Sequence, residues 1–288
     1  MEYGLVTPGG GSIDAVVALE EIARAGFRFL EYSYSHVSAI VNNGDHSLAE
    51  IVDRAESLGL TPVQMHGPSL TRGFDLGSPD AGTRRWSIEL SCKWLEHASR
   101  LDVPVMVEHA CEYHEDFEAT MALVKDSFGE IAKVSLDTGV KVAIENEFDP
   151  RDLLVPSSRG RNMVVPSRVG CTMSELKDIV SESPDSLGVC LDFGHANLQR
   201  PLFGLGDAIR ELGRDLIATH IHDNEGRSDQ HMLPLMGNIP WAEATAALTE
   251  VGYRKPVIME TGVPYSPDPE TRRNRLRLLR IVAEELLG

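Results

Sequence analysis

The stretch Leu187-Gly-Val-Cys-Leu-Asp-Phe-Gly-His195 begins with an apolar run that ends at Asp192. Short apolar runs of this kind recur along the chain, and each is followed by a longer amphipathic pattern typical of a helix. The eight runs are Tyr3–Thr7, Phe27–Tyr32, Thr61–His66, Val103–His109, Lys141–Glu145, Leu187–Asp192, Leu216–His222 and Pro256–Glu260. A strict alternation of strands and helices predicts that the strands pair in parallel.

The predicted helices lie at about 12–25, 47–58, 80–100, 115–138, 172–182, 202–213, 240–251 and 269–287. Side chains suited to N-caps occur at Ser12, Ser47, Ser78 and Thr172 or Ser174, and glycines suited to helix ends are Gly26, Gly59, Gly139, Gly213 and Gly252. Eight strand–helix units in 288 residues predict a single TIM-barrel domain, a closed (β/α)8 barrel spanning residues 1–288. A doubly wound open sheet is the alternative, but residues 8–11, Pro-Gly-Gly-Gly, only loosely approximate its phosphate-binding turn.

The composition is that of an ordinary soluble protein, with 42% hydrophobic and 25% charged residues. The net charge of −17 disfavours nucleic acid as a partner and suits a carboxylate-rich site that binds cations. We expect a cytoplasmic protein, because the chain shows neither a secretory signal nor the roughly 20 apolar residues of a membrane helix. The cysteines are scattered and are expected to be reduced thiols: Cys92, Cys111, Cys171 and Cys190.

Acids and histidines gather where the apolar runs finish. In a barrel all strand ends point to one face, the face where active sites are built. Because such groups would repel and desolvate one another, their crowding predicts a cation among them, and Mn²⁺, Co²⁺, Mg²⁺ or Zn²⁺ would suit these ligands. His220 and His222 should share one side of their strand, with Ala218 below them, and Cys190 should point into the barrel beneath Asp192. The polar residues at or just after the strand ends are Glu31, His66, His109, Glu145, Asp192, His195, His220, His222 and Glu260.

The segment 146–171 is unusually long for a loop and is expected over the C-terminal mouth of the barrel. Between residues 151 and 170 its basic side chains face a single acid, Asp152. Two interpretations stay open: a solvated surface excursion, or a lid that grips an anionic or polyhydroxyl substrate. The basic residues are Arg151, Arg159, Arg161 and Arg168.

Four motifs in the C-terminal half carry a family resemblance. They are Gly188-Val-Cys-Leu-Asp-Phe-Gly-His-Ala196, His220-Ile-His-Asp-Asn224, Ser228-Asp-Gln-His-Met-Leu-Pro-Leu-Met-Gly-Asn-Ile-Pro-Trp241 and Val257-Ile-Met-Glu-Thr261. With the eightfold pattern they resemble the xylose isomerase-like TIM-barrel superfamily, which contains sugar phosphate isomerases and epimerases and is related to the endonuclease IV family.

The resemblance implies a metal-dependent sugar or sugar-phosphate isomerase or epimerase. In the epimerase branch one divalent metal is held at the positions of Glu145, Asp192, His220 and Glu260. The two glutamates there also carry protons, and the reaction passes through a metal-stabilised enediolate. Glu31, His195 and Arg227 are then expected to bind the substrate. A lyase, dehydratase or deglycosidase acting on a keto-sugar would use the same residues and stays open, as does a homo-oligomer.

The endonuclease IV branch uses a larger ligand set for a multi-metal cluster. Its additional ligands are matched here by His66, His109, His195, Asp229 and His231, and His222 is a further candidate for metal or substrate. One to three ions per chain are therefore expected. An endonuclease that cuts at abasic sites is the second alternative, but the acidic net charge and the amino-acid sequence of residues 233–241, which is more similar to the sugar isomerases and epimerases, favour sugar chemistry.

Overall fold

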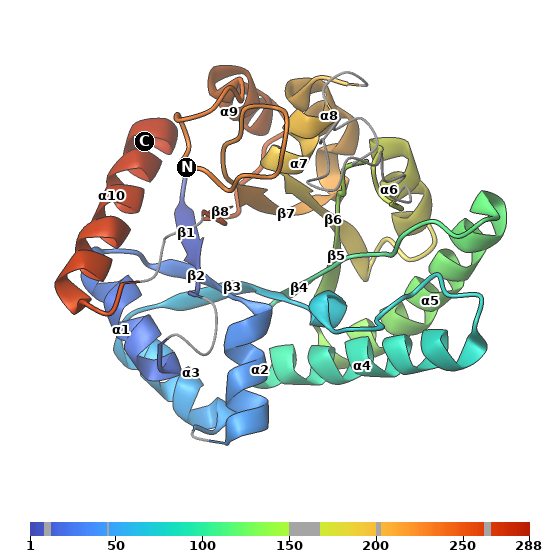
Figure 1. The fold of residues 1–288 in the computed structure, drawn as a ribbon, viewed down its shortest axis with the longest axis horizontal. Coiled ribbons are helices and arrows are strands. Elements are labelled where there is room, and N and C mark those ends of the chain that lie inside the picture. The colour runs from blue at the N-terminus through green and yellow to red at the C-terminus, as the bar shows by residue number, and fades with distance from the viewer. Residues whose placement is uncertain (9–12, 45, 150–167, 200–202, 262–265) are drawn as a thin grey trace, which may run out of the picture.

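Eight parallel strands form a closed barrel in the order β1 to β8, and the TIM-barrel prediction is confirmed (Figure 1). The computed structural model describes residues 1–8, 13–44, 46–149, 168–199, 203–261 and 266–288. The strands are β1 (Tyr3–Val6), β2 (Phe29–Tyr32), β3 (Thr61–His66), β4 (Val105–Glu108), β5 (Lys141–Glu145), β6 (Leu187–Asp192), β7 (Leu216–Ile221) and β8 (Val257–Met259).

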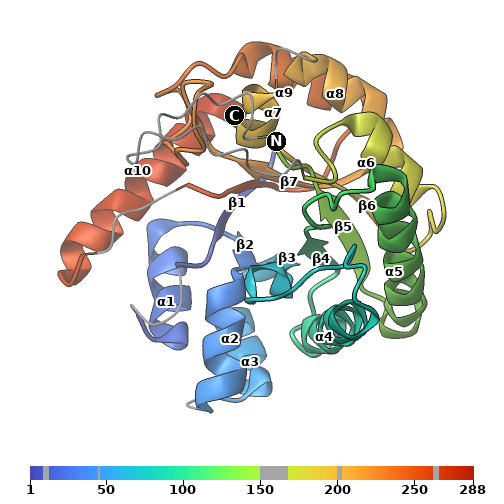
Figure 2. The same ribbon diagram turned by 45° about the vertical axis from the view of Figure 1, so that its right-hand side comes forward.

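Helices surround the barrel, and neighbours such as α4 and α5, or α8 and α9, pack side by side (Figure 2). They are α1 (Ala15–Ala25), α2 (Tyr34–Asn43), α3 (Leu48–Ser57), α4 (Ala81–Arg100), α5 (Phe117–Thr138), α6 (Met173–Val180), α7 (Phe193–Leu198), α8 (Leu205–Leu212), α9 (Trp241–Glu250) and α10 (Pro269–Leu287), with short 3₁₀ turns η1 (Pro68–Leu70) and η2 (Gly213–Asp215). In the part of the chain that the structure describes, these helices are all too short or too polar to span a bilayer.

The helix ends agree with most of the predicted caps. Ser47 and Thr172 each form a capping box with the glutamate three residues later. The prediction for Ser78 is wrong, because the carboxylate of Asp80 accepts from Thr83 N at the start of α4. The first helix is capped by Asp14, while Ser12 lies outside the described residues.

Two helices, α2 and α7, were not predicted. Each begins directly at the end of a strand, with no intervening loop to mark a boundary. Ser33 caps α2, and Asp192 caps α7 through His195 N while also ending β6. Asp192 is thus the last residue of a strand, the N-cap of a helix and a member of the candidate site. Because the sequence pattern was interpreted as a strand end, the helix that follows it was missed.

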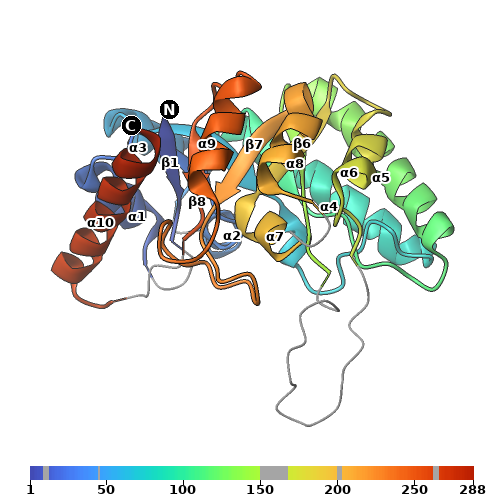
Figure 3. The same ribbon diagram turned by 90° about the horizontal axis from the view of Figure 1, so that it is seen from above.

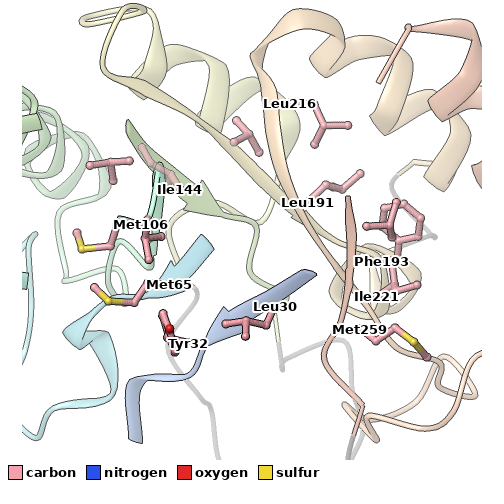
Figure 4. Packing of buried hydrophobic residues seen from close by; sticks show 14 of the residues in the cluster. Leu30, Tyr32, Met65, Met106, Ile144, Leu191, Phe193, Leu216, Ile221 and Met259 are labelled. Carbon is pink, nitrogen blue, oxygen red and sulfur yellow. The ribbon is translucent and has the colours of Figure 1, made fainter. Parts of the chain in front are cut away.

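Side chains alternate between the barrel interior and the helices along every strand. Figure 4 shows the outward side chains, including those of Met65, Met106, Ile144 and Leu191, within the large apolar core. The alternate positions lie in a small interior cluster formed by Val105, Val107, Ala143, Cys190 and Ala218. Two residues further along the same strands, on the same side, lie Glu145, Asp192 and His220. The side chains inside the barrel therefore change from apolar to ionisable between neighbouring inward positions of a strand.

Candidate metal centre

Four side chains from consecutive strands meet at the C-terminal mouth. Glu145 and Asp192 end β5 and β6, His220 lies in β7, and Glu260 follows β8. One ligand atom from each lies within 4.8 Å of all the others. The Nδ1 atom of His220 is 3.1 Å from Glu145 Oε1 and 3.5 Å from Glu260 Oε2. Parallel pairing of Asp192 with His220 produces this convergence, and we call the four residues the central cluster.

A second group shares Glu145 with the central cluster. His66 ends β3 and His109 follows β4, and their Nε2 atoms lie 3.3 Å apart. Both nitrogens face Glu145 Oε2, at 3.7 Å from His66 and 3.1 Å from His109. These three residues also have ligand atoms within 4.8 Å of one another.

A third group shares Asp192. His222 Nε2 lies 3.1 Å from Asp192 Oδ1 and 3.4 Å from Asp229 Oδ1. The ring of His222 stacks on that of His231, with centroids 4.0 Å apart, and His195 Nε2 is 3.6 Å from Asp229 Oδ2. Gly194 makes this packing possible, because a Cβ there would lie 1.9 Å from His222 Cε1.

The segment between β7 and α9 carries Asp229 and His231 and lies beside α7 (Figure 3). A bridge between Asp223 and Met232 folds it back on itself. The buried carboxylate of Asp223 accepts from Trp241 Nε1 at 2.9 Å and so ties the segment to α9. His231 has a φ of 46°, a strained conformation for a residue other than glycine.

Most of the site histidines use one ring nitrogen for a contact behind the ligand groups, which leaves the other nitrogen directed inward. Such outer contacts are typical of histidines that bind metals, since they fix the tautomer and the ring orientation. The outward bonds are His220 Nε2 to Glu31 (2.7 Å), His109 Nδ1 to Glu147 (2.5 Å), His195 Nδ1 to Asn146 O (2.8 Å), His231 Nδ1 to Glu260 O (2.7 Å) and His66 Nδ1 to Gly67 O (3.2 Å).

Glu147 is a site residue that sequence reasoning missed. Its carboxylate lies between His109 and Arg168, whose Nη1 donates to Glu147 Oε2 at 2.7 Å. It follows β5 rather than ending it, so the pattern of strand ends did not reveal it. The spacing Glu145-Asn-Glu147 was the available signal, since residues two apart in an extended segment share a side.

The structure does not bring every predicted residue to the same place. Glu31 is fully buried below His220 and bonded to it, whereas Arg227 is exposed in the β7–α9 segment. Arg168 contacts Glu147 and lies over the ring of Phe148. The remaining arginines of the long loop, Arg151, Arg159 and Arg161, lie outside the described residues, as do residues 150–167 of the loop predicted at 146–171. The metal and substrate roles of all these residues stay predictions.

Charge distribution sets the protonation of the site when no metal is bound. Burial would raise the pKa of Glu145, but His220 and His109 hold it well below its usual value. Burial, reinforced by Glu145, raises the pKa of Glu260. Burial would lower the pKa of His109, yet Glu145 and Glu147 raise it well above the usual value. Protons thus balance the acids where a cation would otherwise do so.

The donors present fit a divalent cation. Within the described residues, several buried site atoms have no hydrogen-bond partner, and such atoms are costly to bury unless something compensates them. Oxygen and imidazole donors in this mixture suit Mn²⁺, Co²⁺, Mg²⁺ or Zn²⁺. The atoms are Glu145 Oε2, Asp192 Oδ2, His222 Nε2 and Asp229 Oδ1; all but Asp192 Oδ2 lie within ion-pair distance of a neighbour without forming a hydrogen bond.

Known proteins resemble the chain along most of its length. The D-psicose 3-epimerase of Ruminiclostridium cellulolyticum is 27% identical over 256 residues, covering 84% of this chain and 76% of that protein. The D-psicose 3-epimerase of Agrobacterium fabrum is 27% identical over 251 residues, covering 84% and 77%.

Solved structures share the fold. The D-psicose 3-epimerase of Clostridium cellulolyticum H10, solved with D-tagatose, superposes with a TM-score of 0.77 over 100% of both chains at 21% identity. The 3-keto-D-glucoside 4-epimerase of E. coli gives 0.75 at 17% identity, covering 98% of this chain and 99% of that one. A family model described as a xylose isomerase-like TIM barrel matches residues 19–281. The chain therefore belongs to the xylose isomerase-like TIM barrel family.

Proposed function

We propose that the protein is a divalent-metal-dependent epimerase or isomerase of a keto-sugar or its phosphate. The observation that carries the proposal is the central cluster, in which Glu145 and Glu260 both approach His220 Nδ1. The distant similarity to D-psicose 3-epimerases supports the same chemistry.

The two glutamates differ in a way that suits proton transfer. The side chain of Glu145 is 2% exposed, whereas that of Glu260 is 25% exposed and reaches the open mouth. Bound at this cluster, a divalent cation would supply the Lewis acidity that makes a C–H bond beside a carbonyl more acidic. Glu145 and Glu260 are then the bases available to remove a proton from that carbon and return one to it. His195 and Arg227 are proposed to contact the sugar.

A second candidate function has its own supporting observation. Glu145 and Asp192 each belong to more than one ligand group, so the mouth has donors for more than one ion. A multi-metal centre suits hydrolysis of a phosphodiester by a metal-activated water, as in an abasic-site endonuclease. The net charge of −17 argues against a DNA substrate.

The test combines elemental analysis with isotope exchange. The purified protein is loaded separately with Mn²⁺, Co²⁺, Mg²⁺ and Zn²⁺, and the bound metal is counted. Each form is then incubated in D₂O with a panel of ketoses and ketose phosphates and, separately, with a duplex containing an abasic site. NMR detects deuterium at the carbon beside the carbonyl, new epimers and eliminated products.

Deuterium incorporation together with a new epimer or isomer supports the proposal, and the Glu260→Gln variant serves as the control that should lose the new epimer or isomer. Exchange followed by an eliminated product would assign a lyase instead. Strand cleavage without any sugar exchange would replace the proposal by the hydrolytic function.

A further inference from the structure

Glu31 is a buried acid at the centre of the barrel that the proposed proton transfer does not use. It is 0% exposed, and so is His220 above it, so neither side chain meets solvent at the mouth. A substrate entering there would first meet more exposed groups such as Glu260 and His231. The substrate contact predicted for Glu31 stays a prediction, and its burial supports a different role, argued from its contacts.

One oxygen of Glu31 makes both of its hydrogen bonds. Oε2 accepts from His220 Nε2 at 2.7 Å and from Gln64 Nε2 at 2.6 Å. Gln64 Nε2 also lies 3.3 Å from Thr219 O in β7. Glu31 and Gln64, from β2 and β3, thus reach across the barrel interior to β7 and hold His220 from below.

A register shift between β2 and β3 produces this pair. Leu30 pairs with Pro62, but Glu31 pairs with Gln64, so Val63 has no partner across the strands. Such a bulge changes which side chains face one another, and here it sets Gln64 beside Glu31 inside the barrel. Without the shift Glu31 would pair with Val63, whose side chain cannot donate a hydrogen bond.

We infer that Glu31 is a positioning residue that fixes His220 with its Nε2–H donated downward and its Nδ1 directed at the central cluster. A carboxylate that accepts from the far nitrogen of a histidine sets the ring orientation and makes the near nitrogen a better donor to a cation. Glu31 thus acts on the metal centre through His220 and does not touch the sugar. This inference rests on the proposed metal centre, but not on the identity of the reaction.

The test measures Zn²⁺ binding without substrate, by competition with a chelator, in the wild type and two variants. Glu31→Leu removes the acceptor and should raise the Kd of the central site about 10–100-fold. Glu31→Gln can keep the carbonyl oxygen at the Oε2 position and should have a smaller effect. Glu21→Gln is the matched control, since Glu21 is also a buried acid but pairs with Arg272 between α1 and α10.

Two spectroscopic measurements separate positioning from general destabilisation. In the Zn²⁺-loaded wild type, ¹⁵N NMR should show a proton on His220 Nε2 with the downfield shift of a strong hydrogen bond, a shift that Glu31→Gln reduces in part and Glu31→Leu abolishes. The visible absorption of the Co²⁺ form should change in Glu31→Leu and not in Glu21→Gln. If Glu31→Leu does not fold, Glu31→Asp replaces it, because the shorter side chain withdraws the carboxylate from His220 Nε2; an unchanged Kd and an unchanged Co²⁺ spectrum in Glu31→Asp overturn the inference.

The outcomes also separate this inference from the proposed function. A wild type that binds Zn²⁺ and turns over no sugar contradicts the epimerase proposal and leaves the effect of Glu31 measurable. A wild type that binds no divalent ion overturns both. Unchanged Zn²⁺ affinity with a raised KM in Glu31→Gln would restore the role of Glu31 as a substrate contact.

Discussion

The two ends of the barrel interior are built on the same strands but differ in chemistry. The lower layer contains Val105, Ala143 and Ala218, small apolar side chains that fill the barrel. The upper layer contains acids and histidines at the next inward positions, such as Glu145 and His220. The lower layer gains stability from burial, whereas the upper layer buries charge that must be compensated. The contrast indicates that the lower layer stabilises the fold, whereas the upper layer contains the residues of the candidate site.

Replacing either glutamate of the upper layer should have the largest effect. Glu145→Gln and Glu260→Gln each keep a carbonyl oxygen for a metal but cannot take a proton at neutral pH. Turnover of any ketose identified as a substrate should fall about 10²–10⁴-fold, while bound metal changes far less. Steady-state kinetics and elemental analysis of the same samples measure the two effects.

The two variants also test how proton transfer is divided between Glu145 and Glu260. If each glutamate serves one face of the sugar, one variant should retain proton exchange from D₂O while losing net epimerisation. Near-normal turnover with full metal in both variants would rule out the two-glutamate proton transfer. The hydrolytic function would then be favoured, because a metal-bound water rather than a side chain reacts there.

A change of pH should affect the upper layer in two opposite directions. In the metal-free protein the carboxylate of Asp229 and the nearby Glu260 raise the pKa of His231 to about 9, although burial alone would lower it. Since its unfolded value is 6.5, this stabilisation is complete below that pH and is lost as pH rises towards about 9. The melting temperature of the metal-free protein should therefore fall across that range.

Metal binding should become stronger as pH rises over the same range, because the cation must displace the protons bound to site histidines such as His231. Each proton displaced makes the apparent affinity rise about tenfold per pH unit, or about 100-fold between pH 6 and pH 8. Thermal denaturation in a chelator and chelator competition with Mn²⁺ measure the two trends. A metal affinity that does not change with pH would contradict the proton occupancy inferred for these histidines.

Glu147→Gln should have a more local effect, because the ligand candidate that Glu147 contacts is His109 and its other partner is Arg168. If His109 binds an ion, the affinity of that site should fall about 10–100-fold, while the central cluster keeps its metal. Glu112→Gln is a suitable control, since Glu112 is an exposed acid that pairs with Arg168 through the backbone alone, in an isolated β-bridge. Unchanged stoichiometry and affinity in Glu147→Gln would assign His109 to substrate or structure.

The sequence predicted what depends on strand periodicity. The eight strands, the barrel closure and the placement of Cys190 beneath Asp192 follow from alternation and from parallel pairing, and the structure agrees. The residues at the strand ends were also identified, and the structure brings most of them together. Residues such as His66 and Glu145 lie far apart in the sequence, but a parallel barrel places all strand ends at one mouth.

What the sequence could not give depends on contacts across the barrel. The role of Glu31 arises from a one-residue register shift, which a single strand pattern cannot reveal. Glu147 lies beyond a strand end, and its partner Arg168 is 21 residues further along the chain. The short helix α7 begins at Phe193, directly after Asp192, so its cap was interpreted only as a site residue.

The smallest expected effect concerns the lower layer, at Cys190. Its thiol is fully buried beside Ala143 and Ala218, but it also lies within 4.8 Å of ligand atoms of Glu145 and His220. Burial raises the pKa of the Cys190 thiol, so it should stay protonated and serve as a small core side chain rather than as a ligand.

Cys190→Ala should cost about 1 kcal/mol of stability for the lost packing and leave the Kd of the metal unchanged. Urea denaturation in a chelator measures the first quantity, and competition with Zn²⁺ and Co²⁺ measures the second. Cys190→Ser adds a comparison in which the volume is kept but a hydroxyl is buried. If Cys190→Ala weakens Zn²⁺ binding by tenfold or more and removes a sulfur-to-Co²⁺ absorption band, Cys190 is a metal ligand. The lower layer then contributes to the metal centre, and the two layers do not differ in chemistry as described.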